Sequence, residues 1–129
     1  MSKLLAKGTF EVELKPMEQN KIGDITFGQF SVKKNFSGDF VGTSEVDMLS
    51  AISDSGSRVY VAIERVSGTL QSRRGSFLFM QRGISMKDLQ ELAVTVIPGF
   101  GTDELTGLEG TMNINIVGKE HFYEFEYSL

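Results

Sequence analysis

The sequence predicts an all-β protein in which eight antiparallel strands form a closed meander barrel. Three observations support this fold class. Apolar and polar residues alternate with a period of two in segment after segment, the connections are short and rich in Gly, Asp and Ser, and no stretch has the periodicity of a long helix. Hairpin-linked strands must protect their outer edges, and closure into a barrel does so completely.

The first four strands are expected at residues 8–14, 28–36, 41–52 and 58–71. In the first of them, Phe10, Val12 and Leu14 share one face. In the second, Phe30, Val32 and Phe36 share one face. The turn between the second and third strands is expected at Gly38 and Asp39, and "SDSGS" (53–57) is expected to be the turn before the fourth strand.

The last four strands are expected at residues 75–81, 89–97, 111–117 and 121–129. The tetrapeptide "SRRG" (72–75) is expected to close the central hairpin. In "SMKDLQEL" (85–92), Ser85 could begin a turn of helix. The irregular segment "PGFGTDELTGLEG" (98–110) is expected to hold one helical turn, with Phe100 capping an end of the barrel.

The length of 129 residues fits a single domain spanning 1–129. The formal net charge of −4 and a pI of about 5.0 argue against a nucleic-acid partner, because such proteins usually carry a basic excess. The absence of cysteine and the presence of a single histidine exclude disulfides, thiol catalysis and sites that need several imidazoles. We therefore expect no metal and no cofactor.

The N-terminal stretch "MSKLLAKGTFEVEL" has too short an apolar run for a signal peptide. No segment approaches the ~20 apolar residues of a membrane-spanning helix. The expected location is therefore cytoplasmic, with no membrane partner.

Several stretches together resemble a family of small bacterial proteins classed as a domain of unknown function. They are "GTFEVEL", "VKKNFSGDFVGTSE", "YVAIERVSGTLQSRRGSFLFMQRG", "VIPGFGTDELTGLEG" and a closing "YEFEY", in this order over nearly the whole chain. The resemblance implies a closed β-barrel similar to allene oxide cyclase. It supplies no function, because fold alone does not imply one.

The sequence departs from the pattern of that family at two positions. Relatives often carry a tryptophan near the end of the first strand, where this chain has Leu14. They often carry a histidine where this chain has Arg82. Any chemical role of that histidine in relatives is therefore not expected here.

The adjacent pair Glu64 and Arg65 interrupts the fourth strand, and neighbouring strand residues point to opposite faces. Tyr60, Ala62 and Glu64 share one face, and both faces begin apolar, so the pattern leaves open which charge points inward. An inward Glu64 would be a candidate general acid or base, or the partner of a basic or hydroxyl group. A bulge could instead turn both charges towards solvent. Arg65 could bind a carboxylate at a mouth of the barrel, or lie on the exterior.

Other candidates come from the second half of the chain. His121 opens the last strand and could shuttle a proton, although a strand end is usually wet. Glu124 and Glu126 alternate with core residues of the same strand and are expected to be solvated. The residues expected to contact a ligand are listed here in chain order: Tyr60, Glu64, Arg65, Gln81, His121 and Tyr123.

Three functions fit these features. The first is a barrel that binds a small apolar molecule in its lumen or mouth, and this is the function we favour. The second is a cofactor-free isomerase or cyclase that uses an inward Glu64, with Gln81 or a tyrosine beside a cavity. The third is an interaction or scaffold protein with a filled barrel, an exposed apolar patch and a homo-oligomeric state.

Overall fold

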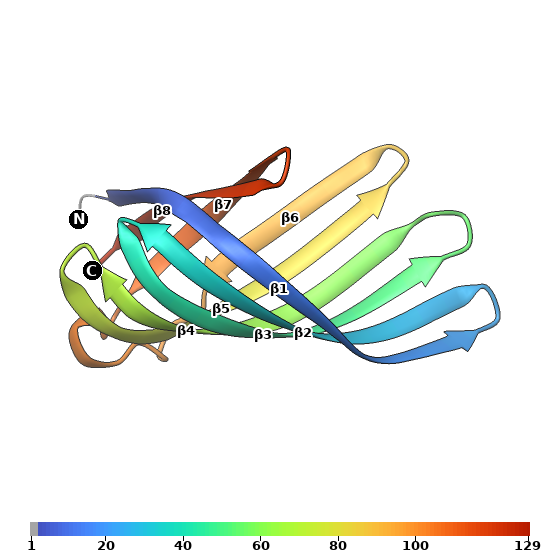
Figure 1. Ribbon diagram of the computed structural model, residues 1–129, viewed down its shortest axis with the longest axis horizontal. Helices are drawn as coiled ribbons and strands as arrows, with labels where there is room; N and C mark the ends of the chain where they lie inside the picture. Colours follow the sequence, from blue (N-terminus) through green and yellow to red (C-terminus); the bar gives the residue numbers. More distant parts are fainter. Residues whose placement is uncertain (1–2) are drawn as a thin grey trace.

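The computed structural model describes residues 3–129 and contains a closed barrel of eight antiparallel strands in sequential order, as the sequence predicts (Figure 1). The strands are β1 (Leu4–Ile22), β2 (Ile25–Gly38), β3 (Phe40–Ser53), β4 (Arg58–Leu70), β5 (Arg73–Met86), β6 (Leu89–Val96), β7 (Glu109–Val117) and β8 (Glu120–Ser128). Their inward faces are apolar faces of the alternation, and in β4, where both faces begin apolar, the inward face is that of Ala62, Glu64 and Val66.

The barrel is closed at one end and splayed at the other. Strand β1 pairs with β8 from Leu4 to Phe10 and then continues along β2 alone. Among the described residues, β6 and β7 share the single register pair Thr95–Thr111. Beyond these points the hairpins β1–β2, β3–β4 and β5–β6 extend to one side as a curved half-barrel (Figure 1).

An aromatic core fills the closed end. The rings of Phe77 and Phe125 stack with centroids 6.1 Å apart, and Phe125 stacks on Tyr127 at 5.2 Å. The hydroxyl of Tyr123 accepts a hydrogen bond from the Phe40 backbone N–H at 2.9 Å and lies 2.9 Å from the Ser37 carbonyl oxygen. This hydroxyl therefore ties β8 to the β2–β3 turn across the end of the barrel.

A 3₁₀ helix, Asp103–Leu105, confirms the helical turn expected in the β6–β7 connection. Leu105 is fully buried and packs beside Gly75, whereas Phe100 is exposed. The cap of this end is therefore Leu105 and not Phe100, because the 3₁₀ turn directs Leu105 inward while Phe100 projects from the loop. The part of the chain that the structure describes has no helix long and apolar enough to cross a membrane.

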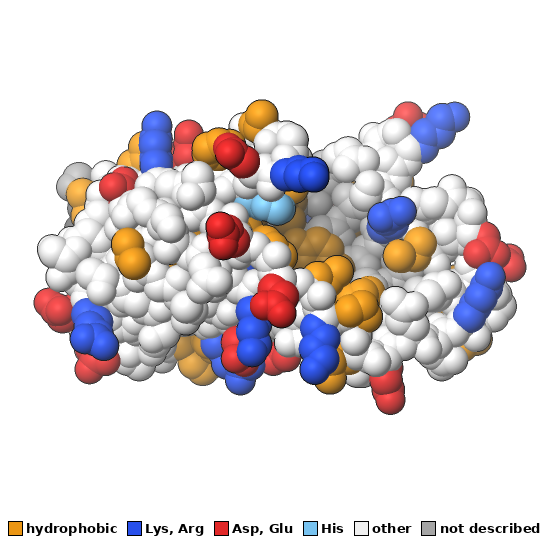
Figure 2. Space-filling view, in the orientation of Figure 1, with side chains coloured by type: hydrophobic (Ala, Val, Ile, Leu, Met, Phe, Trp, Pro, Cys, Tyr) orange, Lys and Arg blue, Asp and Glu red, His pale blue; other side chains and the backbone are white. Residues whose placement is uncertain are grey.

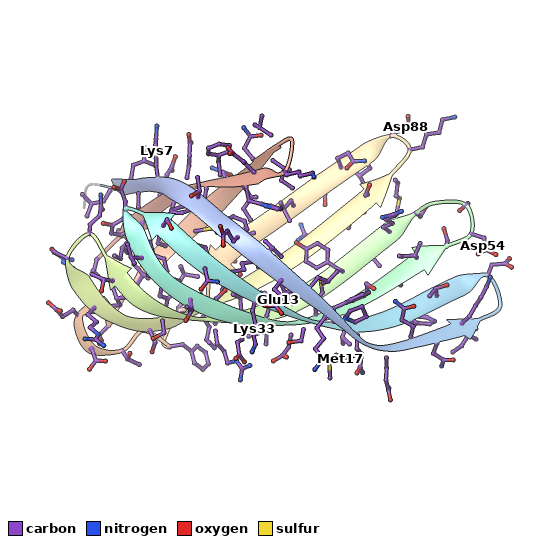
Figure 3. The ribbon with its side chains drawn as sticks, viewed as in Figure 1. Lys7, Glu13, Met17, Lys33, Asp54 and Asp88 are labelled. Atoms are coloured by element: carbon purple, nitrogen blue, oxygen red, sulfur yellow. The ribbon has the colours of Figure 1, made fainter. Side chains whose placement is uncertain are left out.

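The β4–β5 and β5–β6 hairpins are longer than the sequence suggests. The β4–β5 turn lies at Gln71 and Ser72, with φ of 44° and 77°, so it shares only Ser72 with the expected "SRRG" (72–75). Positive φ at both central residues is what a two-residue hairpin of matching twist requires. Ser85 lies within β5 and begins no helix, since pairs up to Met86–Leu89 continue the β5–β6 ladder to its tip. Asp54 and Asp88 mark the tips of the extended hairpins (Figure 3).

Candidate functional site

A hollow opens on the inner side of the splayed half, where β1 leaves β8 and β6 leaves β7. It consists of two cavities of about 330 Å³ and about 210 Å³ that share Met48, Tyr60 and Leu92 in their linings. We call the two together the inner cleft. Figure 2 shows hydrophobic side chains on the floor of a hollow in this face and the histidine beside it.

The walls of the inner cleft are mostly apolar. The larger cavity lies between Leu14 on β1, Phe30 on β2 and Leu92 on β6, and the smaller one reaches Ile114 and Ile116 on β7. Leu14, Leu92 and Ile116 are all more than half exposed although they occupy inward positions of their strands. This exposure follows from the splaying. Because β1 leaves β8 after Phe10 and β6 pairs with β7 at one position, no opposite strand covers these side chains.

A buried polar cluster lies at the inner end of the cleft, and its centre is Glu64. The Oε1 atom of Glu64 accepts hydrogen bonds from Lys34 Nζ, at 3.2 Å, and from Gln81 Nε2. Its Oε2 atom accepts one from Ser44 Oγ at 2.6 Å. We call Lys34, Ser44, Glu64 and Gln81 the Glu64 cluster. Glu64 is 1% exposed, so its oxygens are satisfied by these three donors rather than by water.

The Glu64 cluster is built from four consecutive strands. Lys34, Ser44, Glu64 and Gln81 lie at inward positions of β2, β3, β4 and β5, in line with the apolar neighbours Val32, Val46 and Ala62. The ammonium group of Lys34 also lies 4.8 Å above the ring of Phe10. Because the ammonium and the carboxylate neutralise each other, the lumen buries this pair without a net charge.

Tyr60 connects the Glu64 cluster to the cleft. Its hydroxyl donates a hydrogen bond to Gln81 Oε1 at 3.1 Å, and its ring borders both cavities. The ring crosses β5 at Gly83, where a Cβ atom would lie 2.3 Å from Tyr60 Cε1. Burial, and then the negative charge of Glu64, raise the pKa of Tyr60 above 10.0. Tyr60 is therefore a neutral phenol at neutral pH.

The structure brings four of the six expected ligand-contacting residues together. Tyr60, Gln81 and His121 border the inner cleft, with Glu64 directly beneath Gln81. The ring of His121 lies 5.0 Å from that of Phe10 on the wall of the smaller cavity.

The other two residues of the expected set lie elsewhere. Arg65 is on the outer face, 2.9 Å from Glu45 and 3.6 Å from Asp47, because it is the strand neighbour of the inward Glu64. Tyr123 belongs to the closed end, where its hydroxyl bonds backbone groups. Glu124 is solvated, with Lys7 at 3.8 Å (Figure 3 labels Lys7).

Two residues of the Glu64 cluster escaped the sequence reasoning. Lys34 and Ser44 occupy the inward faces of strands whose apolar alternation is otherwise clear. The alternation could have identified Lys34. It lies two residues from both Val32 and Phe36, so it shares their face of the strand and points inward with them.

The two departures from the family pattern fall in different places. Leu14 borders the larger cavity, so a residue of different size there would change the inner cleft. Arg82 lies on the outer face, 3.8 Å from Glu91, and borders neither cavity.

Comparison with known proteins agrees with this fold. A solved structure of a protein of unknown function from Shewanella oneidensis MR-1, of the DUF3224 family, superposes with a TM-score of 0.93. It is 38% identical in sequence, and the alignment covers 99% of this chain and 98% of the other. No curated protein matches the sequence. The family model described as a protein of unknown function (DUF3224) matches residues 6–127, and the chain belongs to this DUF3224 family.

Proposed function

We propose that the protein binds a small, elongated apolar molecule that carries a hydrogen-bond acceptor at one end. The apolar part would lie along Leu14, Phe30 and Leu92, and the acceptor would reach the floor beside Tyr60, Lys34 and Gln81. The volume of the larger cavity, about 330 Å³, falls near the lower end of the ~300–1,000 Å³ range of ligand pockets.

The observation that carries the proposal is the arrangement of donors in the Glu64 cluster. Both oxygens of Glu64 are occupied by donors, and Glu64 itself borders neither cavity. Lys34 has three N–H groups, one of which bonds Glu64, and its side chain lines the smaller cavity. The cleft therefore meets N–H groups at its inner end, and a ligand atom that accepts hydrogen bonds suits them.

The alternative of a cofactor-free isomerase that uses Glu64 is less well supported. Glu64 does point inward, as that mechanism requires, but three donors occupy its two oxygens, and Gln81 and Lys34 border the cleft where Glu64 does not. A general base needs a lone pair within hydrogen-bond reach of the substrate proton.

Three ligands with matched alkyl chains test the proposal: methyl decanoate, decanoate and decylammonium. The first two carry acceptors, and the third carries only donors. We expect the two acceptors to bind at least ~10-fold more tightly than decylammonium, a difference of ~1.4 kcal/mol. Titrations followed by the backbone amide NMR signals should show shifts at Tyr60 and Leu92 and none at Val41.

Two variants with the same charge change supply the control. Leu92→Arg places a charge in both cavities, whereas Val41→Arg places one on the outer face near the closed end. Binding should be lost in the first variant and kept in the second. Equal affinity for all three ligands, or binding that ignores Leu92→Arg, would contradict the proposal.

A further inference from the structure

The outer face of the central hairpins carries an apolar surface that the inner cleft does not explain. Leu49 on β3, Val61 and Ile63 on β4 and Met80 on β5 are each between 51% and 54% exposed. They point away from the barrel, since their strand neighbours Met48, Ala62 and Gln81 point inward. We call Leu49, Val61, Ile63 and Met80 the outer patch.

The outer patch is continuous. Leu49 is the register partner of Val61, and Ile63 is the register partner of Met80, so the four side chains form a block across three strands. Val59 and its partner Ile84 continue along β4 and β5 towards the hairpin tips, where they also border the larger cavity of the inner cleft. A shallow groove of about 880 Å³ runs over this face and reaches Met17 at the bulge of β1 (Figure 3 labels Met17).

A contiguous apolar surface of this kind on a water-exposed sheet usually marks an interaction site. Two charged residues stand at diagonally opposite corners of the block. Asp47 on β3 is the register partner of Ile63, and Arg82 on β5 is the register partner of Val61. The corners therefore carry opposite charges, separated by the full width of the patch.

We propose that the outer patch is the interface of a two-fold symmetric homodimer. When two equal faces pack together, the two-fold axis lies in the interface, and each residue meets the partner residue at its mirror position across that axis. An axis running roughly from Leu49 to Met80 brings these two residues close to their own copies. The same axis directs Asp47 towards Arg82 of the partner subunit, and it does so twice.

The existing ion pairs of these corners do not oppose the dimer. Asp47 lies 3.6 Å from Arg65, and Arg82 lies 3.8 Å from Glu91, with side chains that are all largely exposed. Exposed pairs of this kind contribute little to stability, so they can rearrange on docking. The patch thus combines an apolar centre with a self-complementary charged rim, which is the usual anatomy of a protein interface.

The first experiment measures mass by light scattering at several protein concentrations. We expect a dimer for the unmodified protein and a monomer for Val61→Lys, which places a charge at the centre of the patch. Val41→Lys, at another exposed valine on the outer face near the closed end, should remain a dimer. A monomeric unmodified protein at the highest attainable concentration overturns the proposal and leaves the patch to a different protein partner.

The second experiment tests the register of the interface by charge reversal. Asp47→Arg alone and Arg82→Asp alone should each weaken the dimer at least ~10-fold, because each places like charges opposite one another. A mixture of the two variants should form a heterodimer of restored affinity, since each of its two corner contacts again joins an arginine to an aspartate. Circular dichroism confirms that each variant is folded. A mixture of folded variants that stays monomeric overturns the proposed pairing.

Discussion

Glu64 and Arg65 are adjacent in β4, yet one is buried and the other solvated. The Glu64 side chain is 1% exposed and accepts hydrogen bonds from Lys34, Ser44 and Gln81. The Arg65 side chain is 58% exposed and pairs with acidic groups on the outer face. The wall of the barrel separates the two charges, so their energetic roles differ although they are one residue apart.

This difference predicts unequal costs of truncation. Glu64→Ala leaves the Lys34 ammonium buried without its counter-ion, and we expect the free energy of unfolding to fall by ~3–5 kcal/mol. Arg65→Ala removes only exposed ion pairs and should cost at most ~1 kcal/mol. Urea denaturation measures both. The double variant Lys34→Met with Glu64→Gln should be more stable than Glu64→Ala, and a lower stability would argue against the buried pair.

The Tyr123 hydroxyl is predicted to stabilise the closed end. Tyr123→Phe leaves the buried Phe40 backbone N–H without its acceptor, and the expected loss is ~1–3 kcal/mol. Tyr127→Phe is the matched control, because the Tyr127 hydroxyl bonds the side chain of Gln71 in the exposed β4–β5 turn. Equal losses in the two variants would show that the bond to Phe40 has no special role.

The three tyrosines, Tyr60, Tyr123 and Tyr127, should make the fold sensitive to alkali. Burial raises the pKa of each above 10.0. A raised folded-state pKa contributes stability that is fully present below pH 10.0 and is lost as the pH rises through the folded-state pKa. The absorbance of tyrosinate should therefore develop with a midpoint above pH 10.0 in the native protein. In urea its midpoint should lie at the ordinary pKa of tyrosine, 10.0. Tyr60→Phe should reduce the loss of unfolding free energy at alkaline pH. A tyrosinate titration of the native protein centred at pH 10.0 would contradict the prediction.

Gly83 is predicted to control the shape of the inner cleft. A Cβ atom at this position would lie 2.3 Å from Tyr60 Cε1, so Gly83→Ala must displace the ring. We expect loss of the Tyr60–Gln81 hydrogen bond, visible as changed NMR signals of both side chains, and at least ~10-fold weaker ligand binding. Gly56→Ala strains only its own turn, where φ is 97° and no atom lies near the new Cβ, and should leave binding unchanged.

Leu105 is predicted to stabilise the closed end more than Phe100 does. Leu105→Ala removes a fully buried side chain and should cost ~2–5 kcal/mol, because it leaves a cavity against Gly75. Phe100→Ala removes an exposed ring from the same loop and should cost less than ~1 kcal/mol. The midpoints of thermal unfolding compare the two, and a larger loss at Phe100 would restore it as the cap.

Much of the fold could be predicted because period-two alternation encodes the face of each strand directly. Phe10, Phe36 and Phe125 occupy the inward faces that the alternation assigns to them. Strand ends were less predictable. The turn at Gln71 and Ser72 uses positive φ at two residues that rarely adopt it, so composition pointed instead to the glycine of "SRRG". The resemblance to allene oxide cyclase stays a prediction.

The candidate site was predictable only in part. An inward Glu64 was one of three interpretations, beside an inward Arg65 and a bulge that exposes both charges, and the burial of Ala62, Glu64 and Val66 decides between them. The openness of the lumen could not be read from the sequence, because it depends on where β1 parts from β8 and β6 from β7. These partings are properties of the whole sheet and leave no local pattern.

The splaying that creates the inner cleft also leaves β1 beyond Phe10 as an edge strand, a ready template for aggregation. This edge carries several features that discourage pairing with another chain. Pro16 has no N–H to donate, the register shifts between Pro16 and Glu18, and Lys15 and Lys21 add charge. The protein can therefore hold a barrel open in water without inviting fibril growth, and replacing Pro16 and Lys15 with β-formers would remove that safeguard.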